Sequence, residues 1–222
     1  MVMIEMTIAQ QARALAHNRT RQPPNTAISV FAEERVRLAA TAVPGGVVGV
    51  GTTIDDRTLL DPHGAQTTVY DALGGHISVV VFYRGAWCPY CNLALATYRA
   101  QLLPELEHRG VNLVAISPQT PDGSLTTRDK NELRSTVLSD PGNALAGQLG
   151  LVVAPAPDVI AAQPQLGLDL PSANAEGTTA IPMPTTLIVD ARRVVRWVGV
   201  YPDYSSRSEV ADILAALGCM RS

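Results

Sequence analysis

Short apolar runs alternate with stretches of helical periodicity over the central part of the chain. The apolar runs predict β-strands at residues 77–83, 111–117, 137–140, 151–153, 185–190 and 194–200. The last two are separated by a tight turn and predict a hairpin. Helices are expected at residues 89–109, 129–136, 143–149 and 209–217, with Pro104 as a kink in the first of them. This alternation predicts an α/β fold with a central mixed sheet flanked by helices.

The chain before residue 77 has a different pattern. Residues 5–17 and 27–42 predict two helices that are separated by a polar stretch and followed by Pro44-Gly45-Gly46. A strand and turn are expected at residues 59–64, and Thr67 or Thr68 can cap a short helix that ends at Gly74-Gly75.

These patterns divide the chain into two expected parts. Residues 1–46 form an N-terminal helical extension, and residues 47–222 form the main domain. Within that domain, residues 154–180 are rich in Pro, Ala, Asn and Gly and predict an irregular insertion with some helix.

The composition limits the partners that we expect. The chain has 222 residues, a hydrophobic content of 46% and a net charge of −3, with no basic run. Nucleic acid and anionic membranes are therefore not expected as partners. No apolar run approaches the roughly 18 residues of a membrane span, and the N-terminus lacks the pattern of a secretory signal. Three cysteines do not form a disulfide framework, so we expect a reducing, cytoplasmic location.

The motif Cys88-Pro89-Tyr90-Cys91 carries the strongest chemical signal. It follows a strand and opens a helix, so Cys88 is expected at the N-cap and Pro89 at the first helical position. The free N–H groups and the positive end of the helix dipole would then lower the pKa of Cys88. Cys91 lies one turn further on nearly the same face. We expect Cys88 to be a nucleophilic thiol with Cys91 as its resolving partner.

A metal site and inert thiols are the two alternatives to redox chemistry at this motif. A zinc site needs four ligands, whereas only Cys219 and four widely spaced histidines remain, so no metal or other cofactor is expected. Inert thiols are the other alternative. Cys219 is interpreted as incidental, and the N-terminal helices could either cover the sheet edge or support a homodimer.

The order of elements resembles the thioredoxin fold. In that fold a proline with a cis bond precedes the third central strand and packs against the CxxC motif. Pro184, within Met183-Pro184-Thr185-Thr186, stands at the matching position before residues 187–189. Thr185 and Pro184 are accordingly candidate supporting residues of the site.

The 96 positions between Cys88 and Pro184 exceed the path in compact thioredoxins. The extra elements, together with Arg84-Gly85-Ala86-Trp87-Cys88-Pro89-Tyr90-Cys91, resemble the peroxiredoxins of the AhpC/TSA superfamily, in particular redoxins with a thioredoxin-type CxxC. The resemblance implies that Cys88 attacks a hydroperoxide and becomes a sulfenic acid, and that Cys91 condenses with it to a disulfide. A thioredoxin-type or low-molecular-weight thiol would then reduce the disulfide.

The sequence departs from the typical peroxidatic motif P-x-x-x-T-x-x-C at two places. Val81 takes the place of the proline, and Gly85 takes the place of the threonine. The usual active-site arginine is also missing near Pro184, and Arg84 is the candidate substitute. Trp87 is expected either to shape a substrate surface or simply to pack, and Arg207 and Tyr204 are interpreted as structural residues of the last helix.

Three functions remain open on the sequence. The first is a thiol-dependent reductase of hydroperoxides. The second is a protein disulfide reductase of the thioredoxin or glutaredoxin type, which shares the CPYC motif and Pro184. The third is a non-enzymatic thiol switch.

Overall fold

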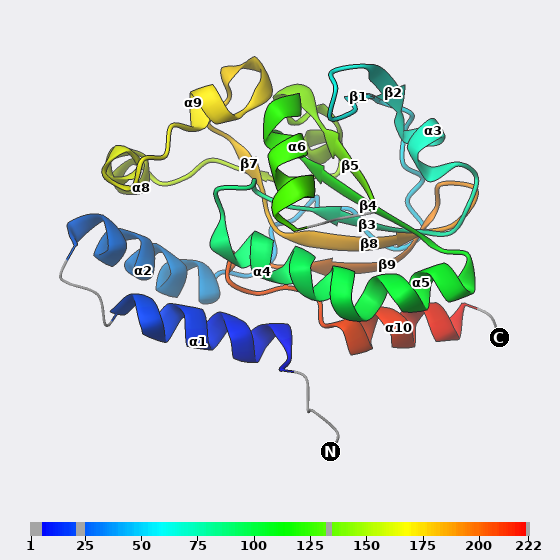
Figure 1. Cartoon of the computed structure of the whole chain (residues 1–222), viewed down its shortest axis with the longest axis horizontal. Helices are drawn as coiled ribbons and strands as arrows, with labels where there is room; N and C mark the ends of the chain where they lie inside the picture. The colour runs from blue at the N-terminus through cyan, green and yellow to red at the C-terminus, as the bar shows by residue number, and fades with distance from the viewer. Residues whose placement is uncertain (1–5, 21–24, 132–134, 221–222) are drawn as a thin grey trace.

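A seven-stranded mixed sheet forms the centre of the molecule (Figure 1). The structure, a computed structural model, describes residues 6–20, 25–131 and 135–220. The strand order is β2-β1-β5-β4-β3-β8-β9. Strands β3, β4 and β5 run parallel, whereas β8 pairs antiparallel with both β3 and β9. The strands are β1 (Thr58–Leu60), β2 (Gln66–Thr68), β3 (Ser78–Phe82), β4 (Asn112–Ser117), β5 (Thr136–Ser139), β8 (Thr185–Val189) and β9 (Val195–Val200).

The alternation of side chains along the central strands creates two hydrophobic cores. Val79 and Val81 of β3 belong to the core beneath α4 (Pro89–Thr97), α5 (Leu103–Arg109) and α10 (Val210–Cys219). Val80 and Phe82 point to the opposite face, where they pack with α3 (Val69–Leu73) and α7 (Ala144–Gln148). Because both faces are covered, every residue of β3 is buried.

The predicted kink at Pro104 is a short π-helical segment, Tyr98–Leu102, that joins α4 to α5. A proline has no N–H to donate within a helix. The N–H of Leu103 reaches back to the carbonyl of Tyr98, so the helix widens by one residue instead of breaking. Gly110 ends α5 in the left-handed conformation.

The N-terminal helices α1 (Ile8–Thr20) and α2 (Thr26–Ala39) lie against the α4 and α10 side of the molecule (Figure 1). The Glu209 carboxylate accepts hydrogen bonds from the N–H groups of Ile8 and Ala9 at 2.9 and 2.8 Å, and thereby caps α1. The Tyr204 hydroxyl donates to the carbonyl of Phe31 in α2 at 2.7 Å. Residues distant in sequence therefore attach both helices to the main domain.

The expected irregular insertion contains short elements. These are β6 (Val152–Val153), α8 (Pro157–Ala162), a 3-10 turn at Gln163–Leu166, α9 (Leu170–Ala173), a 3-10 turn at Ala175–Gly177 and β7 (Ile181–Pro182). Strands β6 and β7 pair with each other in a separate two-stranded sheet. Arg37 of α2 forms an exposed ion pair with Asp158 of α8 at 3.1 Å, so the insertion touches the N-terminal helices.

Two sequence-based expectations about this fold are wrong. The helix expected at residues 129–136 is instead α6 (Pro121–Lys130), and Thr136 already belongs to β5. Thr120 caps α6 and Pro121 follows at its first position, a start signal that outweighs the polar composition of the helix. The peptide bond before Pro184 is not cis, since the described part of the chain contains no cis bond.

Smaller differences concern the ends of elements. The last helix continues through Gly218 to Cys219. Residues 47–54 form a turn at Val50-Gly51 and a bridge from Thr53 to Val194. Thr68, Gly74 and the hairpin of β8 and β9 are as expected. Across the described ranges, no helix is long and apolar enough to span a membrane.

Candidate active site

Cys88 is the N-cap of α4, and Pro89 takes the first helical position, as the motif predicts. Both Cys88 and Cys91 are free thiols, and each is about 1% exposed. The Cys88 side chain makes no capping hydrogen bond to the helix N–H groups. The helix therefore fixes the position of the Cys88 sulfur but donates no hydrogen bond to it.

The expected fall in the pKa of Cys88 is wrong for this geometry. Burial raises the pKa of Cys88 well above its ordinary value, and its hydrogen bond to Cys91 raises it further. Burial acts in the same direction on Cys91, but the hydrogen bond from Cys88 and the Arg207 cation outweigh it and hold the pKa of Cys91 well below its ordinary value. The environment of the pair thus favours ionisation of Cys91 over ionisation of Cys88.

Arg207 supplies the positive charge at Cys91. Its Nη2 donates to Cys91 Sγ at 2.9 Å, and the N–H of Arg84 approaches the same sulfur at 3.4 Å. Nη1 of Arg207 donates to the carbonyls of Tyr204 and Ser206, which fixes the guanidinium beneath the motif. The interpretation of Arg207 as a purely structural residue is therefore wrong. Its distance from the motif in the sequence, 116 positions from Cys91, left no local signal for this contact.

Arg84 lies on the other side of Cys88, between two aromatic rings. Its guanidinium carbon is 4.9 Å from the centre of the Trp87 ring and 4.2 Å from that of Tyr204. Arg84 is buried, and its charge lowers the pKa of Cys88 against the larger effect of burial. The rings hold this cation beside the nucleophile by cation–π attraction.

The loop between β3 and α4 is held by Gln119, which the sequence analysis did not single out. Its Oε1 accepts from the N–H of Ala86 at 2.7 Å. Its Nε2 donates to the hydroxyls of Ser117 and Thr127 at 3.2 Å and of Tyr83 at 3.4 Å. These contacts fix the loop that carries Arg84 and Trp87.

Gly85 cannot be replaced by threonine within this loop without a change in the loop itself. Its φ of +148° lies in a region that residues with side chains rarely adopt. A Cβ at this position would collide with the indole nitrogen of Trp87. The hydroxyl of the usual motif is therefore excluded by the way Trp87 packs.

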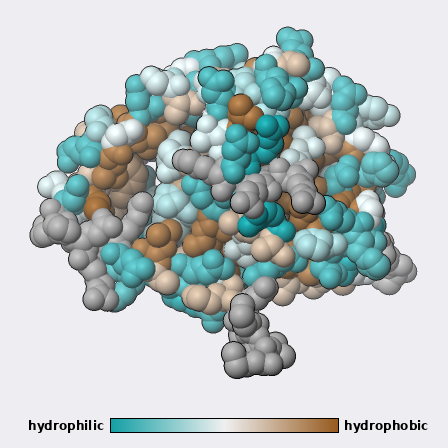
Figure 2. Space-filling view, viewed as in Figure 1, coloured by the Kyte–Doolittle hydropathy of each residue, from teal (hydrophilic) through white to brown (hydrophobic). Residues whose placement is uncertain are grey.

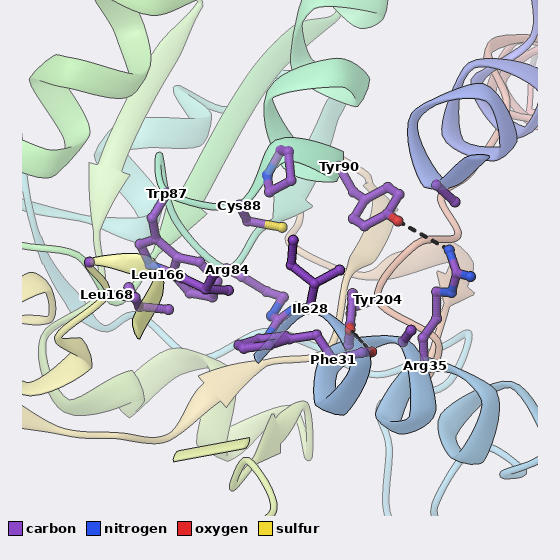
Figure 3. A pocket seen from close by; sticks show the side chains of 14 residues that line it. Ile28, Phe31, Arg35, Arg84, Trp87, Cys88, Tyr90, Leu166, Leu168 and Tyr204 are labelled. Carbon is purple, nitrogen blue, oxygen red and sulfur yellow. Dashed lines mark hydrogen bonds between the residues drawn. The ribbon is translucent and has the colours of Figure 1, made fainter. Parts of the chain in front are cut away.

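A cavity of about 340 Å³ opens above Cys88 (Figure 3). Arg84, Trp87, Cys88, Pro89 and Tyr90 line its inner side. The N-terminal helices contribute Ala16, Ile28, Phe31, Ala32 and Arg35, and the remaining lining residues are Leu166, Gly167, Leu168 and Tyr204. Cys91 does not line the cavity, so a small molecule in it reaches Cys88 first.

The expected supporting residues divide into two groups. Arg84 and Trp87 line the cavity with Cys88. Thr185 is buried at the start of β8, where its hydroxyl donates to the carbonyl of Met183 at 3.0 Å. Pro184 accepts a hydrogen bond from the N–H of Tyr201, and neither Pro184 nor Thr185 lines the cavity. Pro184 and Thr185 therefore lie at the start of β8 and not at the cavity.

A model of the AhpC/TSA family matches residues 50–198. The chain belongs to the AhpC/TSA family. Two curated Mycobacterium tuberculosis proteins, "Putative peroxiredoxin Rv2521" and "Putative peroxiredoxin MT2597", are each 34% identical to this chain over 84 residues. That match covers 38% of this chain, and the chain spans about half the length of these relatives, 52%.

Solved structures of AhpC/TSA-type proteins confirm the fold of this family member. Reduced Prx3 from Vibrio vulnificus in complex with hydrogen peroxide has a TM-score of 0.64 at 20% identity, over 79% of this chain and 99% of the other. Peroxidoxin BcpB from Mycobacterium tuberculosis has a TM-score of 0.59 at 22% identity, over 78% of this chain and 98% of the other. The thioredoxin fold in its peroxiredoxin-like form, as expected from the order of elements, is therefore confirmed.

Proposed function

We propose that this AhpC/TSA protein is a thiol peroxidase that reduces hydroperoxides at Cys88, with Cys91 as the resolving thiol. The observation that carries the proposal is the position of Cys88 at the inner end of the cavity, with Cys91 behind it. Arg207 contacts Cys91 and Arg84 lies beside Cys88, so the pair lies between two cations.

The charge distribution defines a sequence of proton transfers. The Cys88 proton moves along the thiol–thiol hydrogen bond to Cys91, which leaves a thiolate on Cys88. That thiolate attacks the distal oxygen of ROOH, the O–O bond breaks, and the leaving alkoxide takes the proton from Cys91. The products are the alcohol ROH, a sulfenic acid on Cys88 and a thiolate on Cys91.

Resolution then needs only the neighbouring thiolate. Cys91 Sγ attacks Cys88 Sγ, the S–S bond forms, and the displaced hydroxide takes a proton from solvent to become water. Two electrons pass from the thiol pair to the peroxide. A thioredoxin-type or low-molecular-weight thiol restores both thiols by exchange.

Arg84 supports cleavage of the O–O bond. In the usual motif a threonine and an arginine assist this step, and both are absent here. Its buried guanidinium lines the cavity together with Cys88. A fixed cation in a site shielded from water stabilises the negative charge that develops on the leaving oxygen. We assign this positioning of charge to Arg84, with Trp87 and Tyr204 as its supports.

The proposal predicts opposite roles for the two cysteines. Cys88→Ser abolishes hydroperoxide consumption, because the sulfur that lines the cavity is removed. Cys91→Ser lets a sulfenic acid accumulate on Cys88, which dimedone labelling and mass spectrometry detect. Cys219→Ser is the matched control and keeps wild-type turnover. Protein that consumes neither hydrogen peroxide nor an organic hydroperoxide with any thiol donor contradicts the proposal.

Reduction of disulfides is the second candidate, and Gly85 favours it because no hydroxyl is available at that position for peroxide activation. The cavity under α2 would admit a small disulfide. Reduction of a mixed glutathione disulfide, faster than reduction of any hydroperoxide, would establish disulfide reduction in place of peroxide reduction.

A non-enzymatic thiol switch would give a different result. Oxidation would stop after one equivalent of peroxide, and the elution volume of the protein would change if the switch controls a homodimer.

A further inference from the structure

The cavity above Cys88 is much larger than hydrogen peroxide requires. Its volume of about 340 Å³ lies in the range of sites that hold small organic molecules, about 300–1,000 Å³. Hydrophobic residues gather on this side of the molecule, between α2, α4 and α8, which Figure 2 shows in brown. A site of this size and character is suited to a hydroperoxide with an organic body.

Part of the cavity wall comes from segments of the chain outside the match to the family. That match covers residues 50–198, whereas Ile28, Phe31 and Arg35 precede it and Tyr204 follows it. In Figure 3, Ile28 and Phe31 rise from α2 toward the Cys88 sulfur. The hydrogen bond from Tyr204 to the carbonyl of Phe31 fixes this part of α2 above the site. The residues of these segments therefore add to the cavity beyond what the family match covers.

Two arginines, Arg35 and Arg84, line the cavity together with its apolar residues. Arg35 of α2 donates from Nη1 to the Tyr90 hydroxyl at 3.1 Å, which directs its guanidinium along the cavity wall. Within the described residues, the structure records no ion pair within 4 Å for Arg35 or Arg84. The buried Glu34 lies close enough to Arg84 for their charges to interact. Arg35 is thus the cation placed to receive an anionic group from a bound molecule.

We propose that the cavity selects a hydroperoxide with an apolar body and a carboxylate. This inference rests on the proposed peroxidase function. The hydroperoxyl group lies at Cys88 Sγ, the apolar body packs on Ile28 and Phe31, and the carboxylate binds Arg35. Arg84 remains beside the reacting oxygens. The chemistry at sulfur is the one described above, with the carboxylate unchanged.

A matched pair of substrates isolates the role of the carboxylate. Cumene hydroperoxide and the same compound with a para-carboxylate differ only in the charged group. We expect kcat/KM to rise from hydrogen peroxide to cumene hydroperoxide, and to rise by a further factor of about 10 for the carboxylated compound, as one charge-assisted hydrogen bond at a partly exposed site provides. Equal values for the two cumene compounds overturn the proposal.

Variants on the same helix separate binding from general effects. Arg35→Gln removes the preference for the carboxylated substrate, mainly through KM, and Phe31→Ala lowers kcat/KM for both cumene compounds relative to hydrogen peroxide. Arg37→Gln and Val36→Ala are the matched controls, since both residues are exposed and lie outside the cavity lining. If Arg37→Gln changes the substrate preference as much as Arg35→Gln does, or Val36→Ala lowers kcat/KM as much as Phe31→Ala does, the assignment of Arg35 or Phe31 to substrate binding is wrong.

A binding measurement keeps the inference testable without turnover. 4-Isopropylbenzoate, the unreactive analogue, is titrated into reduced protein while tryptophan fluorescence is recorded, since Trp87 lines the cavity. We expect about 10-fold weaker binding to Arg35→Gln and unchanged binding to Arg37→Gln. Binding without peroxide consumption would refute the peroxidase function alone, whereas peroxide consumption without binding would refute this inference alone.

Discussion

Gly85 shows how one residue decides the chemistry of its neighbours. Its backbone conformation and its contact with the Trp87 indole leave no room for a side chain. Trp87 in turn stacks on Arg84, which lines the cavity with Cys88. The packing of Trp87 therefore has two effects. It excludes a threonine side chain at position 85, and it holds the Arg84 cation beside Cys88.

Gly85→Thr is expected to impair the protein although it restores the usual motif. The unfavourable φ and the collision with Trp87 lower the free energy of unfolding by at least about 2 kcal/mol and displace Arg84. Urea denaturation and peroxide consumption measure the two effects. Gly45→Thr is the control, because no atom lies within 4 Å of its added Cβ. A Gly85→Thr variant that is stable and faster than wild type would contradict this account.

Arg207 is one of the groups that lower the pKa of Cys91. Its contact with Cys91 Sγ helps to hold the pKa of Cys91 below its ordinary value. The native protein thus binds fewer protons at this site than the unfolded chain over the pH range between the two pKa values. The associated stabilisation is complete above the ordinary pKa and is lost as the pH falls through the native one.

Arg207→Gln is therefore expected to move thiol ionisation to higher pH. Thiolate absorbance at 240 nm and the rate of iodoacetamide labelling, both followed against pH, report the shift, and labelling at pH 6 is severalfold slower. Arg196→Gln serves as the control, because Arg196 forms its ion pair with Asp190 on an exposed part of β9. Overlapping titration curves for Arg207→Gln and wild type would show that Arg207 does not hold the thiolate.

At the scale of elements, sequence patterns predict those helices and strands whose formation depends on neighbouring residues in the chain. The buried strand β3, the capped helix α4, the short helix after Thr68 and the terminal hairpin all follow from periodicity and caps. The helix α6 was missed because its residues are polar and show no apolar stripe. The site was predicted only as far as residues near Cys88, since Arg207, Gln119 and α2 reach it through tertiary contacts.

The docking of α1 offers a test at this scale. Glu209→Gln replaces one carboxylate oxygen by an NH₂ group that faces the N–H groups at the start of α1. We expect a loss of about 1 kcal/mol in the free energy of unfolding and faster hydrogen exchange in α1. Glu105→Gln is the control, since that residue is exposed and forms its ion pair with Arg109 four residues away. Unchanged exchange in α1 would mean that Glu209 does not anchor it.

At the scale of the whole molecule, the redox state of the pair changes the balance of charge in the core. In the proposed reaction, a Cys88–Cys91 disulfide would take away the sulfur acceptor of Arg207, and within the described residues its guanidinium would then keep the two carbonyl acceptors. The contact with Cys91 thus stabilises the reduced protein in particular.

Arg207→Gln is accordingly expected to destabilise the reduced form by about 1–3 kcal/mol more than the oxidised form. Urea denaturation of wild type and variant, each with and without dithiothreitol, gives the comparison. The exposed Arg196→Gln change should affect both redox forms equally. Equal losses for Arg207→Gln in the two states would refute a specific effect on the reduced protein.

The link between Glu209 and the start of α1 joins residues 201 positions apart. A chain emerging from the ribosome exposes α1 and α2 early, whereas Tyr204 and Glu209, which anchor them, follow much later. The thiol motif is therefore synthesised before the residues that hold its cover in place. Until Glu209 has been added, these contacts cannot fix the two helices over the site.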